Sequence, residues 1–378
     1  MPGGVPSRDM SSVAVLGAGI VGSAAAWDLA RRGHTVDLGD VTAPDEVAAS
    51  VGARAIAVDA SDPSSIAAFI AKYELVVSAV PYAFGMTVAS AAVAGGTHYL
   101  DFGGNPAVVA RQLTLDEAAR AAGVAVIPDC GLAPGMANVL AVGVVAMLGE
   151  GPIDSVRLRV GALPAVPTGA LGYQLAFNPA GLVNEYAEPC EVLVDRAYAT
   201  VEPLTEIEDV EWDGWGPLEA FHTAGGSSSL PRMWEGRVAD LNYKTLRFPG
   251  HGHVFRSVLE MGMFDESPQP GTGVAPRSVL LEALRANLPA GADDVVLVRV
   301  WATATRHGEH RTAGYQVVDR HDGRFSALAR TTAFPATALA DQILAGAVVP
   351  GARTMDGAIS APVLIESMVP VGIEVEEF

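Results

Sequence analysis

The stretch Val13-Ala14-Val15-Leu16-Gly17-Ala18-Gly19-Ile20-Val21-Gly22 decides the fold of this chain. An apolar run of strand length passes directly into a Gly-x-Gly-x-x-Gly turn, and the helix-like segment 20–32 follows. In such a turn Gly17 allows the tight bend, and Gly19 lets a pyrophosphate approach the backbone. Gly22 lets the helix pack closely on the strand, and the helix start presents free N–H groups to phosphate. The stretch therefore predicts a dinucleotide-binding turn.

An acidic residue stands where a bound ribose would need one. Asp40 ends the next apolar run, about 20 residues after the glycine turn, and Asp37 takes this position if the strand ends earlier. A carboxylate there accepts hydrogen bonds from the ribose hydroxyls and repels a 2′-phosphate. Residues 41–50 contain no Arg or Lys that would bind such a phosphate. The sequence therefore predicts NAD as the cofactor in preference to NADP.

Residues 12–130 alternate short apolar runs with Ala-rich, helix-like segments such as 107–122. Continuous apolar runs are typical of parallel strands that are covered on both faces. The candidate strands are Val13–Leu16, Thr35–Leu38, Ala55–Val58, Leu75–Ala79, Tyr99–Phe102 and Val124–Ile127. Regular alternation of strand and helix predicts an α/β fold with an N-terminal Rossmann-type, doubly wound parallel sheet.

The pattern changes after Pro134-Gly135. Long loops and single helices mix there with strand-like stretches at 155–160, 295–303 and 314–318. This mixture predicts a second, α+β domain, which would bind substrate and mediate oligomerisation. We therefore expect residues 1–133 to form the dinucleotide-binding domain and residues 134–330 to form the substrate domain. The helix-like end of the chain, 331–378, is expected to pack back onto the first domain.

The composition argues against several classes of protein. Hydrophobic residues make up 50% of the chain and charged residues 18%, as in a well-buried globular protein. The formal net charge of -19 repels phosphate backbones and anionic lipid, so nucleic acid and membranes are not expected partners. The apolar run 137–148 is too short to span a bilayer, and residues 1–12 lack the apolar core of a signal peptide. With only two cysteines and therefore no disulfide framework, we expect a cytoplasmic protein.

Four further segments narrow the class of protein. They read DCGLAPG at 129–135, LEAFHTAGGSSSL at 218–230, NYKTLRFPGH at 242–251 and TTAFPAT at 331–337. Together they resemble the saccharopine dehydrogenase superfamily and, within it, the L-lysine 6-dehydrogenases. The resemblance extends over nearly the whole chain. Residues 165–172 depart from the family pattern, in a segment that is a candidate border of the substrate pocket.

The resemblance implies an NAD-dependent amino-acid dehydrogenase that acts on a CH–NH2 group. The expected reaction is oxidative deamination of the ε-amino group of L-lysine: NAD accepts hydride, water adds to the imine and ammonia leaves. The product, 2-aminoadipate 6-semialdehyde, would then close to a piperideine carboxylate. The resemblance also implies a homodimer or a higher homo-oligomer.

Two alternatives to this function stay open. One is another enzyme of the superfamily, acting on a different amino acid or on a secondary amine such as saccharopine. The other is a non-catalytic, NAD-binding sensor.

One short segment carries the residues expected to meet the substrate. Arg247 is the best anchor for an α-carboxylate, because a guanidinium fork matches two carboxylate oxygens. Lys244 and His222 are candidate general bases, since an ammonium must lose its proton before carbon gives up hydride. On an extended segment Tyr243, Thr245 and Arg247 share one face and Lys244 points to the other. These residues therefore fit a single pocket only if the segment is irregular.

Loops at the carboxyl edge of the sheet supply further candidates, because ligands bind there in this fold class. The predicted catalytic residues are Lys244, His222, Asp101 and Asp129. The predicted substrate-binding residues are Arg247, Thr245, Tyr243 and Thr223. The predicted cofactor-binding residues are Gly17, Gly19, Ile20, Val21, Gly22, Asp40, Pro81, Asp129, Gly131 and Ala133.

Each candidate also has an ordinary structural interpretation. Arg247 could form a surface or inter-subunit ion pair. His222 could be a hydrogen-bonded core residue that holds the loop at 225–226. Lys244 could cap a helix or pair with Asp240.

Three other features are interpreted as structural. Cys130 is expected to be a small buried residue, and Trp212 and Trp215 are expected in the core or at an interface. His251 and His253 resemble a fragment of a metal site, but no third ligand follows at a suitable spacing. No metal site is therefore expected.

Overall fold

The computed structural model describes residues 11–291 and 293–378, and the chain divides into two compact units. The described residues up to Gly131 form the first unit together with Ala333–Ile359, and Leu132–Thr332 form the second with Ser360–Phe378. The sequence had placed the whole of 331–378 with the first domain. Residues 360–378 belong to the second unit instead, because the terminal strand β16 (Val375–Glu377) pairs with β14 of that unit.

The first unit is built on a seven-stranded sheet in the order β15-β6-β5-β4-β1-β2-β3. All of its strand pairs are parallel. Read from β3 to β6, this is the 3-2-1-4-5-6 order of the dinucleotide-binding fold. Its strands are β1 (Ser12–Leu16), β2 (Thr35–Asp40), β3 (Arg54–Ala57), β4 (Leu75–Ser78), β5 (His98–Asp101), β6 (Ala125–Ile127) and β15 (Gly351–Ala352). The predicted Rossmann-type sheet is confirmed, and β15 is a seventh strand that the sequence did not reveal.

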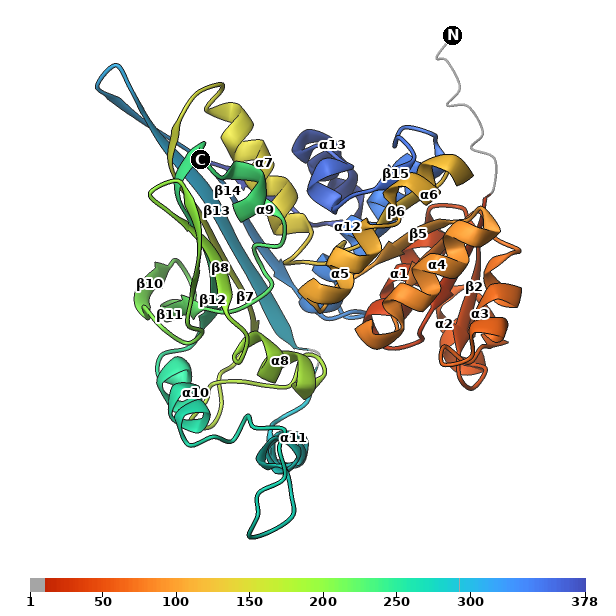
Figure 1. Cartoon of the computed structure of the whole chain (residues 1–378), viewed down its shortest axis with the longest axis horizontal. Helices are drawn as coiled ribbons and strands as arrows, with labels where there is room; N and C mark the ends of the chain where they lie inside the picture. Colours follow the sequence, from red (N-terminus) through yellow and green to blue (C-terminus); the bar gives the residue numbers. More distant parts are fainter. Residues whose placement is uncertain (1–10, 292) are drawn as a thin grey trace. The chain divides into compact units, whose positions relative to one another are not determined.

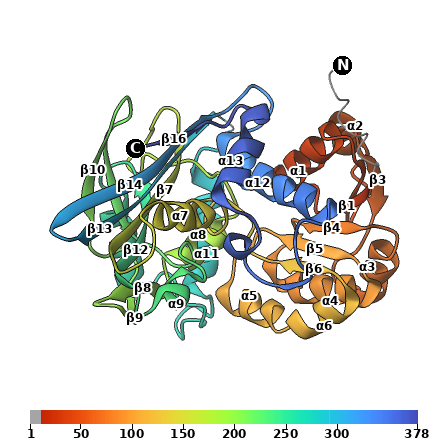
Figure 2. The ribbon, with the colours of Figure 1, turned by 90° about the horizontal axis from the view of Figure 1, so that it is seen from above.

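Helices cover both faces of this sheet, as the apolar strands require. Figure 2 shows α1 and α2 on one side and α3, α4 and α6 on the other, and Trp27 of α1 packs on Phe334 of α12. Buried residues of β1, β4, β5 and β6 form one core with α3 and α4. The helices are α1 (Ile20–Arg31), α2 (Asp45–Val51), α3 (Pro63–Ile70), α4 (Gly85–Gly95), α5 (Pro106–Leu113), α6 (Asp116–Ala122) and the short η1 (Tyr82–Phe84) and η2 (Met355–Gly357). Helix α12 (Ala327–Leu344) joins this unit from Ala333 onward.

The second unit is built on a nine-stranded sheet in the order β10-β11-β12-β7-β13-β14-β16, in which β8 also pairs with β12 and β9 pairs with β8. The pair β12–β7 is parallel and the other pairs are antiparallel. Its strands are β7 (Ile153–Pro164), β8 (Cys190–Val194), β9 (Ala197–Val201), β10 (Glu208–Trp212), β11 (Gly216–His222), β12 (Val238–Arg247), β13 (Asp294–Arg306), β14 (Glu309–Arg320) and β16. This mixed sheet is the second domain that the sequence predicted.

Helix α7 (Met136–Met147) runs along one face of this sheet and contacts β13, β14 and β7 (Figure 1). A separate apolar core joins α8 (Pro179–Glu185), α10 (His251–Glu260) and α11 (Pro276–Asn287) to β11. The remaining helices are α9 (Leu230–Trp234), α13 (Ala361–Met368) and η3 (Val369–Val371). Among the described residues, no helix combines the length and the apolar character needed to cross a bilayer.

Candidate functional site

The glycine turn lies between β1 and α1. Gly17 has a φ of +106°, and a Cβ there would lie 2.7 Å from the Ala79 carbonyl oxygen. A Cβ on Gly22 would lie 1.8 Å from the Gly17 carbonyl oxygen, so the helix approaches the turn only because this residue is glycine. A Cβ on Gly19, in contrast, would meet no atom within 4 Å. Gly19 therefore borders open space, which fits a pyrophosphate that approaches the backbone.

The first turn of α1 is open to an anion. Its N-cap is Gly19, which offers no side-chain cap, and Ile20 is 62% exposed. Free backbone N–H groups and the positive end of the helix dipole make such a helix start a phosphate site. Val21 follows in the same turn, and Pro81 is exposed after β4, at the start of η1. These residues could hold the pyrophosphate of a dinucleotide.

Asp40 ends β2 and ties that strand to the glycine turn. Its two carboxylate oxygens accept the backbone N–H groups of Ala18 at 2.8 Å and of Val41 at 2.7 Å. Asp37, the alternative acid, lies within β2, is buried, and accepts a hydrogen bond from Arg54 Nε at 3.0 Å. Asp40 is therefore the acid at the carboxyl edge of the sheet, and Asp37 is not.

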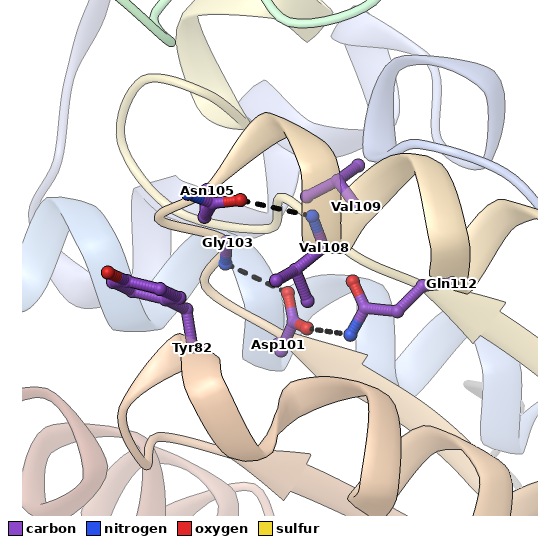
Figure 3. A pocket seen from close by; sticks show the side chains of 7 residues that line it. All are labelled: Tyr82, Asp101, Gly103, Asn105, Val108, Val109 and Gln112. Carbon is purple, nitrogen blue, oxygen red and sulfur yellow. Dashed lines mark hydrogen bonds between the residues drawn. The ribbon is translucent and has the colours of Figure 1, made fainter. Parts of the chain in front are cut away.

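Asp101 is the last residue of β5, and its carboxylate is hydrogen-bonded on both oxygens (Figure 3). One oxygen accepts from the Tyr99 hydroxyl at 2.7 Å and from Gln112 Nε2 at 2.6 Å. The other accepts from the backbone N–H groups of Gly103 at 2.8 Å and of Asp129 at 3.1 Å. These bonds occupy the acceptor positions that a general base would use. They give Asp101 a structural role, which the sequence did not predict: it joins the loops that follow β5 and β6.

Asp129 follows β6 and is buried, with a φ of +61° that non-glycine residues rarely adopt. A Cβ on Gly103 would lie 2.0 Å from the Asp129 carboxylate, so the close packing of these two loops depends on that glycine. A small pocket opens beside them, lined by Tyr82, Asp101, Gly103, Asn105, Val108, Val109 and Gln112 (Figure 3). Gly131 is buried at the end of this unit, and Ala133 already belongs to the second unit.

Strand β12 is regular up to Arg247, so its side chains alternate between the two faces of the sheet. Lys244 and Arg247 contact different sets of residues as a result. The irregularity that would bring Lys244 into one pocket with Tyr243, Thr245 and Arg247 does not occur. The structure therefore separates the predicted bases from the predicted carboxylate anchor.

Lys244 and His222 stand opposite each other in register and share an ion-pair network. Lys244 Nζ donates to the Glu206 carbonyl oxygen at 2.6 Å and lies 3.1 Å from Glu208 Oε2, and His222 Nε2 lies 3.0 Å from Glu206 Oε2. Arg159 of β7 also pairs with Glu208. The partners of Lys244 and His222 are thus these two glutamates, and neither Asp240 nor the loop at 225–226.

The same network explains the shifted pKa values of its members. Burial lowers the pKa of His222, and this effect outweighs the hydrogen bond to Glu206 that raises it. The hydrogen bond with His222 lowers the pKa of Glu206. Burial opposes ionisation of Glu208, but the bonds from Arg159 and Lys244 outweigh it and lower its pKa. Neutral His222 and ionised glutamates are the expected states near pH 7.

Arg247 is held by a chain of hydrogen bonds on the other face of β12. His251 Nδ1 lies 3.2 Å from the Leu171 carbonyl oxygen, which can only accept, so this nitrogen carries the proton. His251 Nε2 must then accept from the Tyr186 hydroxyl at 3.0 Å, and that hydroxyl accepts from Arg247 Nε at 3.1 Å. Burial lowers the pKa of His251 to about 3, in agreement with a neutral ring. The chain orients the guanidinium, whose Nη1 also donates to the Leu246 carbonyl oxygen at 2.9 Å.

Arg247 is 3% exposed and has no carboxylate within 4 Å among the described residues. Glu219 stands opposite it in register, but the Glu219 carboxylate accepts the backbone N–H groups of Gly250 at 2.8 Å and Gly252 at 2.5 Å. The other buried Arg and Lys side chains described in this unit, Arg159, Lys244 and Arg330, each form an ion pair. A buried cation without an anion is costly, so Arg247 is suited to bind one.

Of the other predicted substrate residues, Tyr243 and Thr245 lie close to Arg247 in the chain, and Thr223 follows β11. Thr245 Oγ1 and Thr223 Oγ1 are 2.7 Å apart, and both side chains are buried. Tyr243 packs under the glycine loop, because a Cβ on Gly226 would lie 2.4 Å from its ring. The hydrogen bond between Thr223 and Thr245 gives these two side chains a structural role as well.

Four residues that surround Arg247 are absent from the site predicted from the sequence. These are Tyr173, Glu185, Tyr186 and His251, which lie in separate segments of the chain. Of these four, the sequence pointed only to His251, as a fragment of a metal site. No group of three His, Cys, Asp or Glu side chains suited to a metal ion is found among the described residues. In the sequence, only the departure of residues 165–172 from the family pattern indicated that the substrate pocket borders the region next to Tyr173.

Three structural interpretations agree with the observed packing. Cys130 is fully buried, and burial raises the pKa of its thiol well above the usual value. Trp212 is buried in a core with Leu218 and Leu246, and Trp215 packs against the same core. None of these side chains is placed to carry chemistry.

Two family models match the chain: the saccharopine dehydrogenase NADP binding domain over residues 13–127 and the saccharopine dehydrogenase C-terminal domain over 131–371. The chain belongs to the saccharopine dehydrogenase family. The superfamily resemblance seen in the sequence is thereby confirmed. The family description names NADP for the first domain, whereas the sequence had predicted NAD.

Two fungal relatives share less than a quarter of their residues with this family member over the matched region. The chain is 24% identical over 269 residues to saccharopine dehydrogenase [NADP(+), L-glutamate-forming] of Pyricularia oryzae, covering 68% of this chain and 59% of the relative. It is 23% identical over 271 residues to the enzyme of the same name from Schizosaccharomyces pombe, covering 69% and 60%. The chain thus spans about 60% of these relatives. The solved L-Glu-forming saccharopine dehydrogenase of Saccharomyces cerevisiae has the same fold, with a TM-score of 0.81 at 17% identity over 97% of this chain and 99% of that one.

Proposed function

We propose that this family member is a nicotinamide-dependent oxidoreductase that deaminates an amino acid, with L-lysine oxidised at its ε-carbon and NAD as the hydride acceptor. The observation that carries the proposal is Arg247, a buried guanidinium without a carboxylate partner. The α-carboxylate of an amino acid would supply the missing anion. The resemblance of the whole chain to lysine 6-dehydrogenases supplies the choice of lysine.

The residues of the first unit would hold the cofactor. Gly17, Gly19 and Gly22 shape the turn, and the first amides of α1 would bind the pyrophosphate. Asp40 stands where its charge would disfavour a 2′-phosphate, which supports NAD despite the NADP named for the relatives. When bound, the nicotinamide would supply a hydride acceptor for the carbon that carries the amine.

The residues of the second unit would bind and orient the amino acid. Arg247 would hold the α-carboxylate, and Tyr186 and His251 would keep the guanidinium in place through their hydrogen bonds. The apolar core around them excludes water, which strengthens a charge-assisted hydrogen bond. Lys244 and His222 lie outside this group of residues, so we assign neither of them as the general base. Asp129 stays a predicted base at the edge of the first sheet.

The family relatives favour one rival function. Three relatives are named as saccharopine dehydrogenases or as α-aminoadipic semialdehyde synthase, the last from Arabidopsis thaliana. A saccharopine-type secondary amine is therefore the second candidate substrate. A non-catalytic, NAD-binding sensor is the remaining alternative.

A spectrophotometric screen separates these functions. L-lysine, other amino acids, diamines and L-saccharopine are each mixed with the protein and NAD⁺ or NADP⁺, and the absorbance of the reduced cofactor and the released ammonia are measured. We expect reduction with L-lysine and NAD⁺ and one ammonia per cofactor reduced. Reduction with saccharopine and no ammonia would favour the rival enzyme. Nucleotide binding without turnover on any substrate would favour the sensor.

We propose a homo-oligomer in the cytoplasm without nucleic acid or membrane partners, on the basis of the family resemblance and the net charge of -19.

A further inference from the structure

Two polar groups beside Arg247 lack partners of their own. The Tyr173 hydroxyl is buried and has no hydrogen-bond partner, although an unpaired buried hydroxyl costs free energy. Arg247 Cζ lies 5.1 Å from the centroid of the Tyr173 ring. The hydroxyl is therefore a free donor next to a guanidinium that has no carboxylate within 4 Å among the described residues.

Glu185 is the second such group. It is the last residue of α8 and is partly buried, and its carboxylate forms no hydrogen bond or ion pair with any described residue. Glu185 directly precedes Tyr186, whose hydroxyl accepts from Arg247 Nε at 3.1 Å. The charge of Glu185 also acts on Arg247 and Tyr173, in agreement with this placement. The backbone fixes its position, because its carbonyl oxygen accepts the Ala224 N–H at 2.9 Å. Glu185 thus supplies an acceptor without a donor.

We propose that Tyr173 and Glu185 complete, with Arg247, a site for the head group of an L-α-amino acid. Arg247 and the Tyr173 hydroxyl bind the α-carboxylate, and Glu185 binds the α-ammonium group. The three unpaired groups then match the three needs of the zwitterion: a bidentate cation, a second donor and an anion. This assignment rests on the proposed function and adds the recognition of the α-amino group, for which the sequence offered no residue.

The site predicts a pH dependence of binding. Burial raises the pKa of Glu185 to about 7, against the opposing effect of Arg247. The groups that face it are Arg247, Tyr173, Tyr186 and Tyr243, and burial raises the pKa of each tyrosine, so none of the phenols titrates near pH 7. An ammonium ligand requires the ionised carboxylate. Affinity for an α-amino acid should therefore rise with pH from 6 to 8, and binding below pH 7 should release a proton.

Isothermal titration with the full chain and saturating NADH, which cannot accept hydride from the ligand, tests the assignment. The ligands are L-lysine and 6-aminohexanoate, which has the same carboxylate and ε-amine but no α-amino group. Wild-type protein should bind L-lysine about tenfold or more tightly than 6-aminohexanoate, as expected for one charge-assisted pair. Glu185→Gln should abolish this preference and the rise in affinity from pH 6 to 8, and it should leave the binding of 6-aminohexanoate unchanged. Tyr173→Phe should weaken both ligands by about tenfold.

The matched control is Glu188→Gln, which removes the same charge three residues along the chain and should keep the preference and the pH profile. A Glu185→Gln protein that still prefers L-lysine and keeps the wild-type pH profile would overturn the assignment. If wild-type protein bound no amino acid at all, the proposed function itself would fail. If it bound L-lysine and 6-aminohexanoate equally, only the Glu185 assignment would fail.

Discussion

Replacing Arg247 by Met tests whether this residue binds the carboxylate of the substrate or instead stabilises the fold through an ion pair. Methionine keeps much of the volume of the arginine stem but removes the charge and the donors. A carboxylate that loses a buried, charge-assisted partner loses about 2–5 kcal/mol of binding, which corresponds to a rise of about 30- to 5000-fold in KM or Kd. We expect this rise for the amino acid and an unchanged Kd for NAD, because the glycine turn lies in the other unit.

The effect of Arg247→Met on stability should be small, for a reason that the structure supplies. The change removes two hydrogen bonds, to Tyr186 and to the Leu246 carbonyl oxygen, each contributing about 1 kcal/mol. It also removes the cost of burying a cation that has no described carboxylate within 4 Å and whose charge Glu185 compensates only in part, a cost of several kcal/mol. The Tyr186 hydroxyl keeps its bond to His251, so it is not left without a partner. We expect these terms to offset each other, with Tm within a few degrees of wild type.

Arg330→Met is the matched control. Arg330 is also buried, but its guanidinium pairs with Asp319 at 2.9 Å and with Asp322. Removing one partner of such a pair costs about 3–5 kcal/mol, so this variant should lose stability and keep its KM. Thermal unfolding measures the stability of both variants, and cofactor reduction measures their steady-state kinetics. Together these measurements decide whether Arg247 binds substrate or stabilises the fold. If Arg247→Met lost much stability but kept its KM for the amino acid, the proposal that Arg247 binds the substrate carboxylate would be refuted.

Three further predictions concern the cofactor and the ion-pair network. The efficiency kcat/KM should be at least tenfold higher with NAD than with NADP, since Asp40 repels a 2′-phosphate by about 1.4 kcal/mol; equal efficiencies would remove this role of Asp40. Gly19→Ala should weaken NAD binding in a fluorescence titration and leave Tm unchanged, because its Cβ enters open space, whereas the Cβ of Gly22→Ala would collide with the turn and lower Tm. Lys244→Met should lower Tm by leaving Glu208 short of a partner, and it should reduce kcat by less than tenfold with the same pH profile. A loss of 100-fold or more in kcat would instead restore Lys244 as the general base.

The sequence by itself determined the dinucleotide-binding half of the protein. The strand, the glycine turn and the helix start lie within ten consecutive residues, and each interaction that shapes them is local or follows from the parallel strand order. The alternation of side chains along β12 is equally local. The sequence therefore placed Tyr243, Thr245 and Arg247 on one face of the strand and Lys244 on the other, so that all four could line one pocket only if the strand were irregular. The strand is regular, so Lys244 does not share a pocket with the other three residues.

Only the tertiary structure decided what surrounds those residues. Lys244 finds Glu206 and Glu208 nearly 40 positions away, and Arg247 finds Tyr186 at a separation of 61, across loops whose course no periodic pattern encodes. Whether a buried charge has a partner depends on such long-range contacts, because the free energy of a charge is set by its neighbours in space. Two cationic residues of one strand therefore differ in their surroundings: Lys244 joins an ion-pair network on one face of β12, and Arg247, on the other face, has no carboxylate within 4 Å among the described residues.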